Sequence, residues 1–163
     1  MKDQGANIVK GSKKALKSKL QGAIAAGGIS HAIEFCSHEA IPLTDSLSED
    51  YDAQISRVSH KNRNPRNEAN EKEADIINQY KVQLAKEQKL EPTMVEKEST
   101  YHYYSPITIQ SSLCLSCHGK VGKNILEEDY IVLQNLYPND QATGFGMGDI
   151  RGLWKVAFEK EAS

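Results

Sequence analysis

The chain has 163 residues and a mass of 18.1 kDa, the size of one ordinary domain. Its 20 basic and 22 acidic residues give a net charge of -2, which offers no reason to expect a nucleic-acid-binding protein. No apolar run approaches the roughly 18 residues of a membrane-spanning helix, and no secretory signal is visible. Three cysteines, an odd number, exclude a closed set of disulfides.

The N-terminal third is predicted to be helical. Apolar side chains at helical spacing predict one amphipathic helix over about residues 7–26 and a second over about residues 30–45. Gly27-Gly28 separates them, and Pro42 is expected to bend or end the second. The lysines of the first helix are expected to form a solvated face.

The next segments are predicted to be a strand, a loop and a third helix. Alternating residues 53–59 predict a short strand. Residues 61–67, rich in Asn and Pro, predict an irregular loop, and residues 68–86 have helical composition.

The second half is richer in strand patterns. Residues 93–98 and 101–109 are predicted to pair as a hairpin, followed by a short turn that holds two cysteines. A helix over residues 125–136 and a glycine-rich turn precede a strand over residues 150–159. Helices first and strands later predict an α+β fold with an antiparallel sheet.

The segment Cys114-Leu115-Ser116-Cys117-His118 matches the attachment pattern of haem c. One turn of chain presents two thiols at the spacing of the two vinyl groups on one porphyrin edge. The histidine that follows is placed to bind the iron as the proximal ligand. We therefore expect one haem c per chain, attached to Cys114 and Cys117 and bound by His118.

Three other roles for these cysteines fit less well. A structural zinc site needs four ligands, but a second Cys-x-x-Cys pair is missing, and the adjacent Cys117 and His118 do not easily reach one tetrahedral ion. A thioredoxin-like redox pair belongs to a βαβ setting that the pattern does not show. A simple disulfide between Cys114 and Cys117 is the third alternative.

A six-coordinate iron needs a second axial ligand. Cys36 lies on the apolar stripe of its helix and is expected to point into the core, whereas His38 is expected to point away from it. Met147 lies in a glycine-rich turn from which a flexible side chain could reach inward. Spacing alone leaves seven candidates open: Cys36, Met94, Met147, His31, His38, His60 and His102.

Several segments resemble, in order, a family of small mono-haem c-type proteins with a PAS-like fold, catalogued as a domain of unknown function. The family also occurs as the extracytoplasmic sensor part of signalling proteins. The resemblance covers nearly the whole chain, and its specific parts are the Arg-Asn-Pro loop and the Gly-Asp-Ile-Arg-Gly strand. The matching segments are residues 33–42, 55–59, 63–70, 114–119, 142–145 and 148–152.

The resemblance implies a PAS-like central antiparallel sheet with flanking helices and with Trp154 buried. It also implies a cysteine thiolate as distal ligand, which maps onto Cys36 in Phe35-Cys36. Arg57, Arg63 and Arg151 lie in family-like segments and are candidates for contacts with the haem propionates.

The expected function is redox or gas sensing by an extracytoplasmic haem c protein with His/Cys ligation, not catalysis. The alternative is a small electron-transfer cytochrome c, and a peroxidase-type enzyme is the third hypothesis. The signalling or redox partner, the signal and the oligomeric state are not identified by the sequence.

The haem pattern also predicts a compartment, because bacteria attach haem c outside the cytoplasmic membrane. We expect one domain over residues 1–163, with an N-terminal helix over residues 1–27 that follows a trimmed export signal or membrane anchor. Met1 is then an added start.

Overall fold

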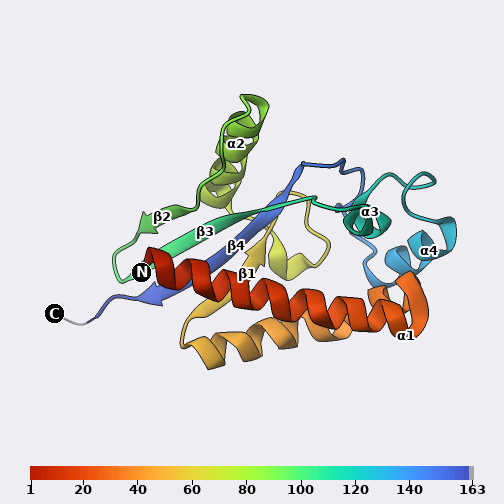
Figure 1. The fold of residues 1–163 in the computed structure, drawn as a ribbon, viewed down its shortest axis with the longest axis horizontal. Coiled ribbons are helices and arrows are strands. Elements are labelled where there is room, and N and C mark those ends of the chain that lie inside the picture. Colours follow the sequence, from red (N-terminus) through yellow and green to blue (C-terminus); the bar gives the residue numbers. More distant parts are fainter. Residues whose placement is uncertain (162–163) are drawn as a thin grey trace.

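A computed structural model describes residues 1–161, and its centre is a four-stranded antiparallel sheet (Figure 1). The strands are β1 (Gln54–Val58), β2 (Thr93–Glu96), β3 (Thr100–Thr108) and β4 (Ile150–Glu159), in the order β1-β4-β3-β2. The last strand of the sequence therefore lies in the interior of the sheet, between β1 and β3. The predicted hairpin of β2 and β3 is confirmed, as is the antiparallel sheet.

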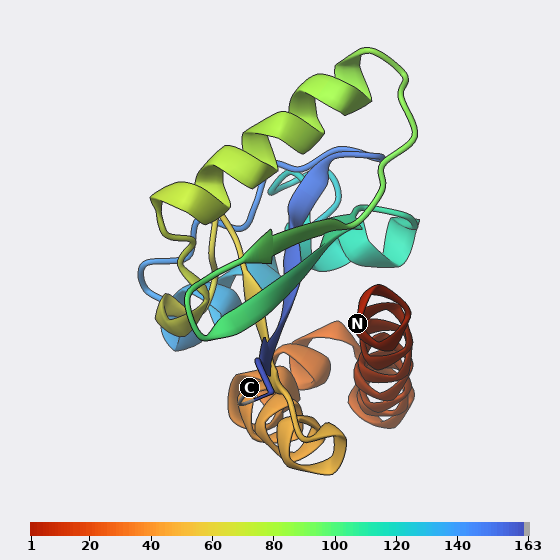
Figure 2. The ribbon, with the colours of Figure 1, turned by 90° about the vertical axis from the view of Figure 1, so that its left-hand side faces the viewer.

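Helix α1 (Lys2–Tyr51) is a helical hairpin broken at Gly28. Gly28 has φ 80° and ψ -169°, a backbone conformation that glycine adopts without the steric cost of a side chain. The two halves run side by side in opposite directions, and Gly11 in the first half faces the Tyr51 hydroxyl at the end of the second (Figures 1 and 2). The predicted break between two helices is confirmed.

The expectation that the second helix ends near residue 45 is wrong, since the helix continues past Pro42 to Tyr51. Proline removes one donor, the one that would bond the carbonyl of His38. His38 is exposed, so water can satisfy that carbonyl. Farther along, the Thr44 hydroxyl donates to the Ala40 carbonyl at 2.8 Å, and the helix carries on.

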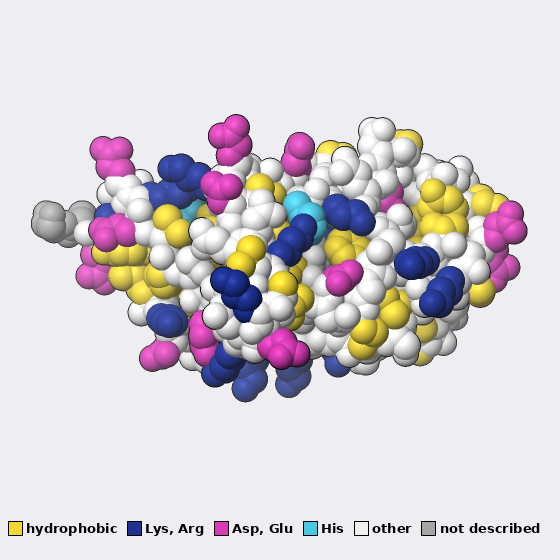
Figure 3. Space-filling model, turned by 90° about the horizontal axis from the view of Figure 1, so that it is seen from above, with side chains coloured by type: hydrophobic (Ala, Val, Ile, Leu, Met, Phe, Trp, Pro, Cys, Tyr) yellow, Lys and Arg dark blue, Asp and Glu magenta, His cyan; other side chains and the backbone are white. Residues whose placement is uncertain are grey.

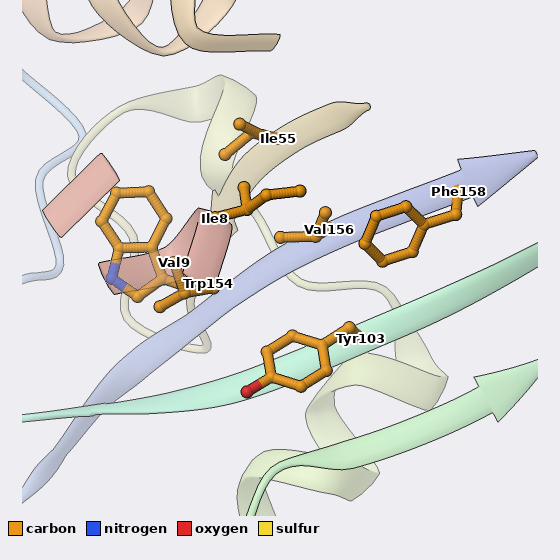
Figure 4. Packing of buried hydrophobic residues seen from close by; sticks show 7 residues of the cluster. All are labelled: Ile8, Val9, Ile55, Tyr103, Trp154, Val156 and Phe158. Atoms are coloured by element: carbon orange, nitrogen blue, oxygen red, sulfur yellow. The ribbon is translucent and has the colours of Figure 1, made fainter. Parts of the chain in front are cut away.

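The α1 face of the sheet holds an aromatic and aliphatic core (Figure 4). Trp154, expected to be buried, is 5% exposed. Gly5 of α1 lies so close to the Tyr103 ring that a Cβ atom there would sit 2.5 Å from it, so the helix approaches the sheet only because this residue is glycine. The buried members of this core are Ile8, Val9, Ile55, Tyr103, Trp154, Val156 and Phe158.

Helix α2 (Glu71–Ala85) covers the opposite face of the sheet (Figure 2). Asn70 and Glu73 form a capping box, in which each side chain accepts a hydrogen bond from the other residue's backbone N–H. Glu73 is 2% exposed and pairs with Lys155 of β4 at 2.7 Å. Apolar side chains of α2, among them Ile77 and Tyr80, complete this second core layer with Leu153.

The remaining short elements gather at the end of the sheet away from the start of α1 and the end of β4 (Figure 1). They are the 3-10 turn Pro65–Asn67, α3 (Ser112–His118) and α4 (Glu127–Leu136). The two cysteines expected in a turn lie in the short helix α3 instead. Within residues 1–161, none of the helices is both long enough and apolar enough to cross a membrane.

Candidate haem site

Helix α3 carries the two cysteines of the haem pattern on one helical turn. Cys114 packs beside the cluster of Ile109 and Phe145, whereas Cys117 packs beside Ile33 of α1. Both thiols are free and partly buried. Burial raises the pKa of Cys117 to about 11, while hydrogen bonds, chiefly with Ser111, outweigh burial at Cys114 and lower its pKa.

His118 ends α3 and has a fixed orientation. Its Nδ1 lies 2.9 Å from the carbonyl oxygen of Ala142, and because a carbonyl only accepts, Nδ1 must carry the proton. Burial, together with the charges of Arg151, Arg63 and Arg57, holds the pKa of His118 well below its usual range. The ring is therefore neutral, with a lone pair on Nε2 that suits a metal.

The loop that follows α4 contacts His118 through backbone hydrogen bonds and through the Phe145 ring. The Phe145 backbone N–H donates to the His118 carbonyl at 2.9 Å, and Gly144 N–H donates to the Gly119 carbonyl at 2.7 Å. The Phe145 ring meets the His118 ring edge-on, with centroids 6.3 Å apart. Backbone bonds and ring packing thus fix the imidazole before any ligand binds.

Arg63 ties the cysteine segment to the same loop. Its Nη2 donates to the carbonyl oxygens of Cys117 at 2.6 Å and Ala142 at 3.0 Å. Its Nε and Nη2 also form a two-pronged ion pair with Asp140, both at 3.1 Å. Arg63 therefore has a structural role at this site, and two of its three nitrogens are already engaged.

Cys36 lies on the second half of α1, which packs against α4. Ser30 Oγ donates to Asp129 of α4 at 2.6 Å, and Ile33 packs against Leu133 and beside Cys117. Cys36 is partly buried, and burial raises the pKa of its thiol, although Arg57 and Arg63 act in the opposite direction. The same two arginines act on His118, so Cys36 and His118 share one electrostatic environment.

Three arginines surround this environment, and one of them is paired with a carboxylate. Within residues 1–161, Asp140 pairs with Arg63, whereas Arg57 and Arg151 form no ion pair. Arg57 stacks over the Trp154 ring with its guanidinium carbon 5.6 Å from the centroid. Burial and then the neighbouring arginines lower the pKa of Arg151 to about 9. The excess of cations favours an anionic occupant.

Arg151 reaches this position through a β-bulge. Ile107 of β3 pairs with Gly152, and Thr108 pairs with Ile150, which leaves Arg151 as the extra residue of β4. Its Nη1 donates to Ser59 Oγ at 2.9 Å, but its buried Nε has no hydrogen-bond partner among residues 1–161. An unsatisfied buried donor of this kind is costly unless a ligand accepts from it.

The other axial candidates lie in less suitable places. His31 and His38 are exposed, as expected for His38, and Met147 is 58% exposed. Met94 packs against the core of the α1 face, and buried His102 contacts the Tyr104 hydroxyl at 3.2 Å. His60 is partly buried and meets the Phe145 ring edge-on.

The residues present fit a c-type haem. The two thiols lie one helical turn apart, His118 offers Nε2, and the arginine cluster with its unpartnered Nε would receive carboxylates. No three His, Cys, Asp or Glu side chains gather as a metal site in the part of the chain that the structure describes. A haem iron takes four ligands from the porphyrin and needs only two from the protein.

Sequence reasoning did not assign Asp140 or the carbonyl of Ala142 to the site. Asp140 follows α4 in a Pro-Asn-Asp turn, and its Oδ1 also accepts from the Ala142 N–H at 2.8 Å. That turn signal marks a loop without indicating which arginine the carboxylate meets.

Comparison with known proteins gives a family and a fold. No curated protein sequence matches the chain. Its fold is similar to the crystal structure of the cyanobacterial heme-protein Tll0287, with a TM-score of 0.66 over 95% of this chain and 94% of that one. At 23% identity this likeness establishes the fold, and the expected α+β, PAS-like class is confirmed. The model of the Tll0287-like family matches residues 3–158, and the chain therefore belongs to that family.

Proposed function

We propose that the protein binds one haem c, attached through Cys114 and Cys117 and held by His118 and Cys36 as axial ligands. The observation that carries the proposal is the hydrogen bond from His118 Nδ1 to the Ala142 carbonyl. It selects the tautomer whose Nε2 can bind iron, and outer partners of this kind are typical of metal-binding histidines. The structural relative is described as a heme-protein, which supports the same conclusion.

Arg57 and Arg151 are better candidates for propionate contacts than Arg63. Arg63 is bonded to Asp140 and two carbonyls, whereas Arg151 is anchored to Ser59 through Nη1 and keeps a buried Nε without a partner among residues 1–161. Arg57 has no ion-pair partner within residues 1–161, and its charge acts to lower the pKa of the Cys36 thiol. A guanidinium in this position can pair with a carboxylate or stabilise a thiolate.

The role that we propose for this haem is redox sensing outside the cytoplasm. A bound haem supplies a one-electron couple. The thioethers and His118 all come from α3, whereas Cys36 comes from the separate second half of α1. Cys36 would therefore be the contact to the haem that could be lost while the other three hold, with its Sγ taking up a proton from solvent. Bound and released Cys36 give the protein the two states that a sensor requires.

Haem attachment is tested by mass spectrometry after acid denaturation of protein produced with the haem c maturation system. The expected mass is that of the chain plus one haem, and Cys36→Ser should retain it. Replacing Cys114 and Cys117 together by Ser should release the haem into organic solvent. Loss of all haem from the unaltered protein on the same extraction would overturn the proposal.

Sensing is distinguished from electron transport by exchange kinetics. The holoprotein is mixed with a soluble cytochrome c, and the haem band is followed by stopped flow. Slow exchange accompanied by a change in the axial ligand is expected for the sensor. Rapid, reversible exchange without ligand change would indicate an electron carrier.

A further inference from the structure

A cavity lies apart from Cys36, on the α2 side of the molecule. Its volume is about 400 Å³, within the range of sites that bind small molecules. Three segments distant in sequence form it: the last turns of α2, the chain after β1, and the loop leading into β4. The lining residues are His60, Lys61, Lys81, Leu84, Ala85, Gly144, Phe145, Asp149 and Ile150.

The floor of the cavity is apolar and rigid. Phe145 and Ile150 are 4% and 2% exposed, so their positions are fixed by the core. Leu84, at 37% exposure, forms part of the rim. Leu84 and Ala85 of α2 are exposed and supply the apolar surface that a small ligand can cover.

The polar part of the lining is mostly basic. Lys61 and Lys81 line the cavity, and Arg151 lies behind it with its guanidinium carbon 5.6 Å from the Phe145 centroid. Asp149 supplies the one lining carboxylate, and its Oδ2 accepts a hydrogen bond from the Gly146 N–H at 2.7 Å. Viewed from the α2 side, basic side chains lie around a histidine near the middle of the face (Figure 3).

His60 adds an unsatisfied polar group. Its Nδ1 is buried and has no hydrogen-bond partner among residues 1–161. A buried ring nitrogen without a partner is unusual in a folded protein and calls for a ligand or an ordered water. The cations beside it make an anionic ligand the favourable one.

We propose that this cavity binds a small organic anion, a carboxylate on a short apolar body. The carboxylate pairs with Lys81 at the rim, and the apolar part covers Leu84 and Ala85. Neither Cys36 nor His118 lines the cavity, and the Phe145 ring lies edge-on to both His60 and His118, with both centroid distances 6.3 Å. The proposal concerns the chain itself and does not rest on the function proposed for the haem.

Binding is tested by isothermal titration calorimetry of the holoprotein with benzoate. Benzyl alcohol has the same ring without the charge, and inorganic phosphate has the charge without the ring. Benzoate is expected to bind at least about tenfold more tightly than either. Equal binding of benzyl alcohol or of phosphate would overturn the proposal, as would no heat with benzoate at millimolar concentration.

Charge reversal at Lys81 locates the site. Lys81→Glu is expected to weaken benzoate binding about tenfold or more, because it places a carboxylate at the rim. Lys72→Glu makes the same charge change on an exposed position of α2 outside the cavity, and screening should limit its effect to less than about twofold. Equal effects of the two variants would overturn the assignment. Both positions are exposed, so folding should be unaffected, and circular dichroism checks this.

Discussion

Arg63 and Asp140 stand 77 residues apart in the chain and meet in a two-pronged ion pair of 3.1 Å. Their side chains are only 12% and 7% exposed. The same guanidinium holds the Cys117 carbonyl, so one arginine connects the loop after β1, the haem-pattern helix and the loop after α4. The geometry of the candidate site therefore depends on a residue that need not touch the haem.

Replacing Arg63 by Met should destabilise the fold. It leaves the carboxylate of Asp140 and two carbonyls without their partner, so the free energy of unfolding should fall by about 3 kcal/mol in urea denaturation. In the Arg63→Met background, Asp140→Asn should change the free energy of unfolding little further, because the two side chains act as one coupled pair. Arg66→Met is the control: its 3.8 Å pair with Asp45 is exposed, so the loss should stay below about 0.5 kcal/mol. Equal losses for the two arginines would contradict the structural role of Arg63.

Cys36→Ala should keep the haem attached and open the distal position. Because a thiolate stabilises ferric iron, its loss should raise the reduction potential by on the order of 100 mV, within the roughly 0.8 V range that axial ligands span. The reduced variant should bind carbon monoxide readily. Redox titration and absorption spectra measure both effects. Met147→Leu, at an exposed residue, should change neither. Unchanged spectra of Cys36→Ala in both oxidation states would make Cys36 a packing residue.

The stability of the protein should fall as the pH falls from about 6.5 to 4. Burial, and then the charges of Lys81, Arg151 and Lys61, lower the pKa of His60 to about 4. The unfolded chain binds a proton at this residue near pH 6.5 and the folded chain only near pH 4, so protons favour unfolding within this window. His60→Gln should remove on the order of 1 kcal/mol of that pH dependence, a value reduced by solvent screening. Urea denaturation at pH 7 and pH 4.5 measures it. An equal fall in stability between the two pH values in the unaltered protein and in His60→Gln would contradict the prediction.

Removing Lys155 should destabilise the fold, because it leaves the buried carboxylate of Glu73 without its cation. Lys155→Met leaves Glu73 without its cation but still beside the Tyr104 hydroxyl and the Asn70 N–H. The expected loss is about 3 kcal/mol in the free energy of unfolding. Lys160→Met breaks a pair of the same length with Glu96, a residue 65% exposed, and should lower the free energy of unfolding far less because solvent screens that pair. A similar small loss for both lysines would show that burial does not strengthen the Glu73 pair.

Local patterns predicted the elements well where a backbone rule decides the outcome. The glycine pair at residues 27–28 broke the helix, because Gly28 needs a positive φ. The alternating pattern over residues 150–159 predicted β4 with the bounds that the structure has, because one face of that strand packs against α1. The helix was wrongly expected to end after Pro42. The free-energy cost of a proline inside a helix depends on whether water reaches the carbonyl that loses its donor, here that of His38, and exposure to water is a property of the tertiary structure.

The residue types of the candidate site could be named from the sequence, but the contacts between them could not. A covalent attachment requires its cysteines and histidine at fixed spacing, so the spacing singled out Cys114, Cys117 and His118 as candidates, and their attachment to haem stays a prediction. The pairing of Arg63 with Asp140 and the bulge that frees Arg151 depend on how distant segments meet. Nothing in a one-dimensional pattern specifies a strand register at that resolution. Cys36 as iron ligand stays a prediction.

Both ends of the described chain lie at one end of the molecule, and α3 and α4 lie at the other (Figure 1). A linker joined near Lys2 or beyond Glu159 would therefore point away from Cys114 and His118. The protein can be tethered by either end to an electrode or a neighbouring domain without covering the end that carries the candidate haem site. Any signal that passes between the two must travel along the length of the sheet or of the α1 hairpin.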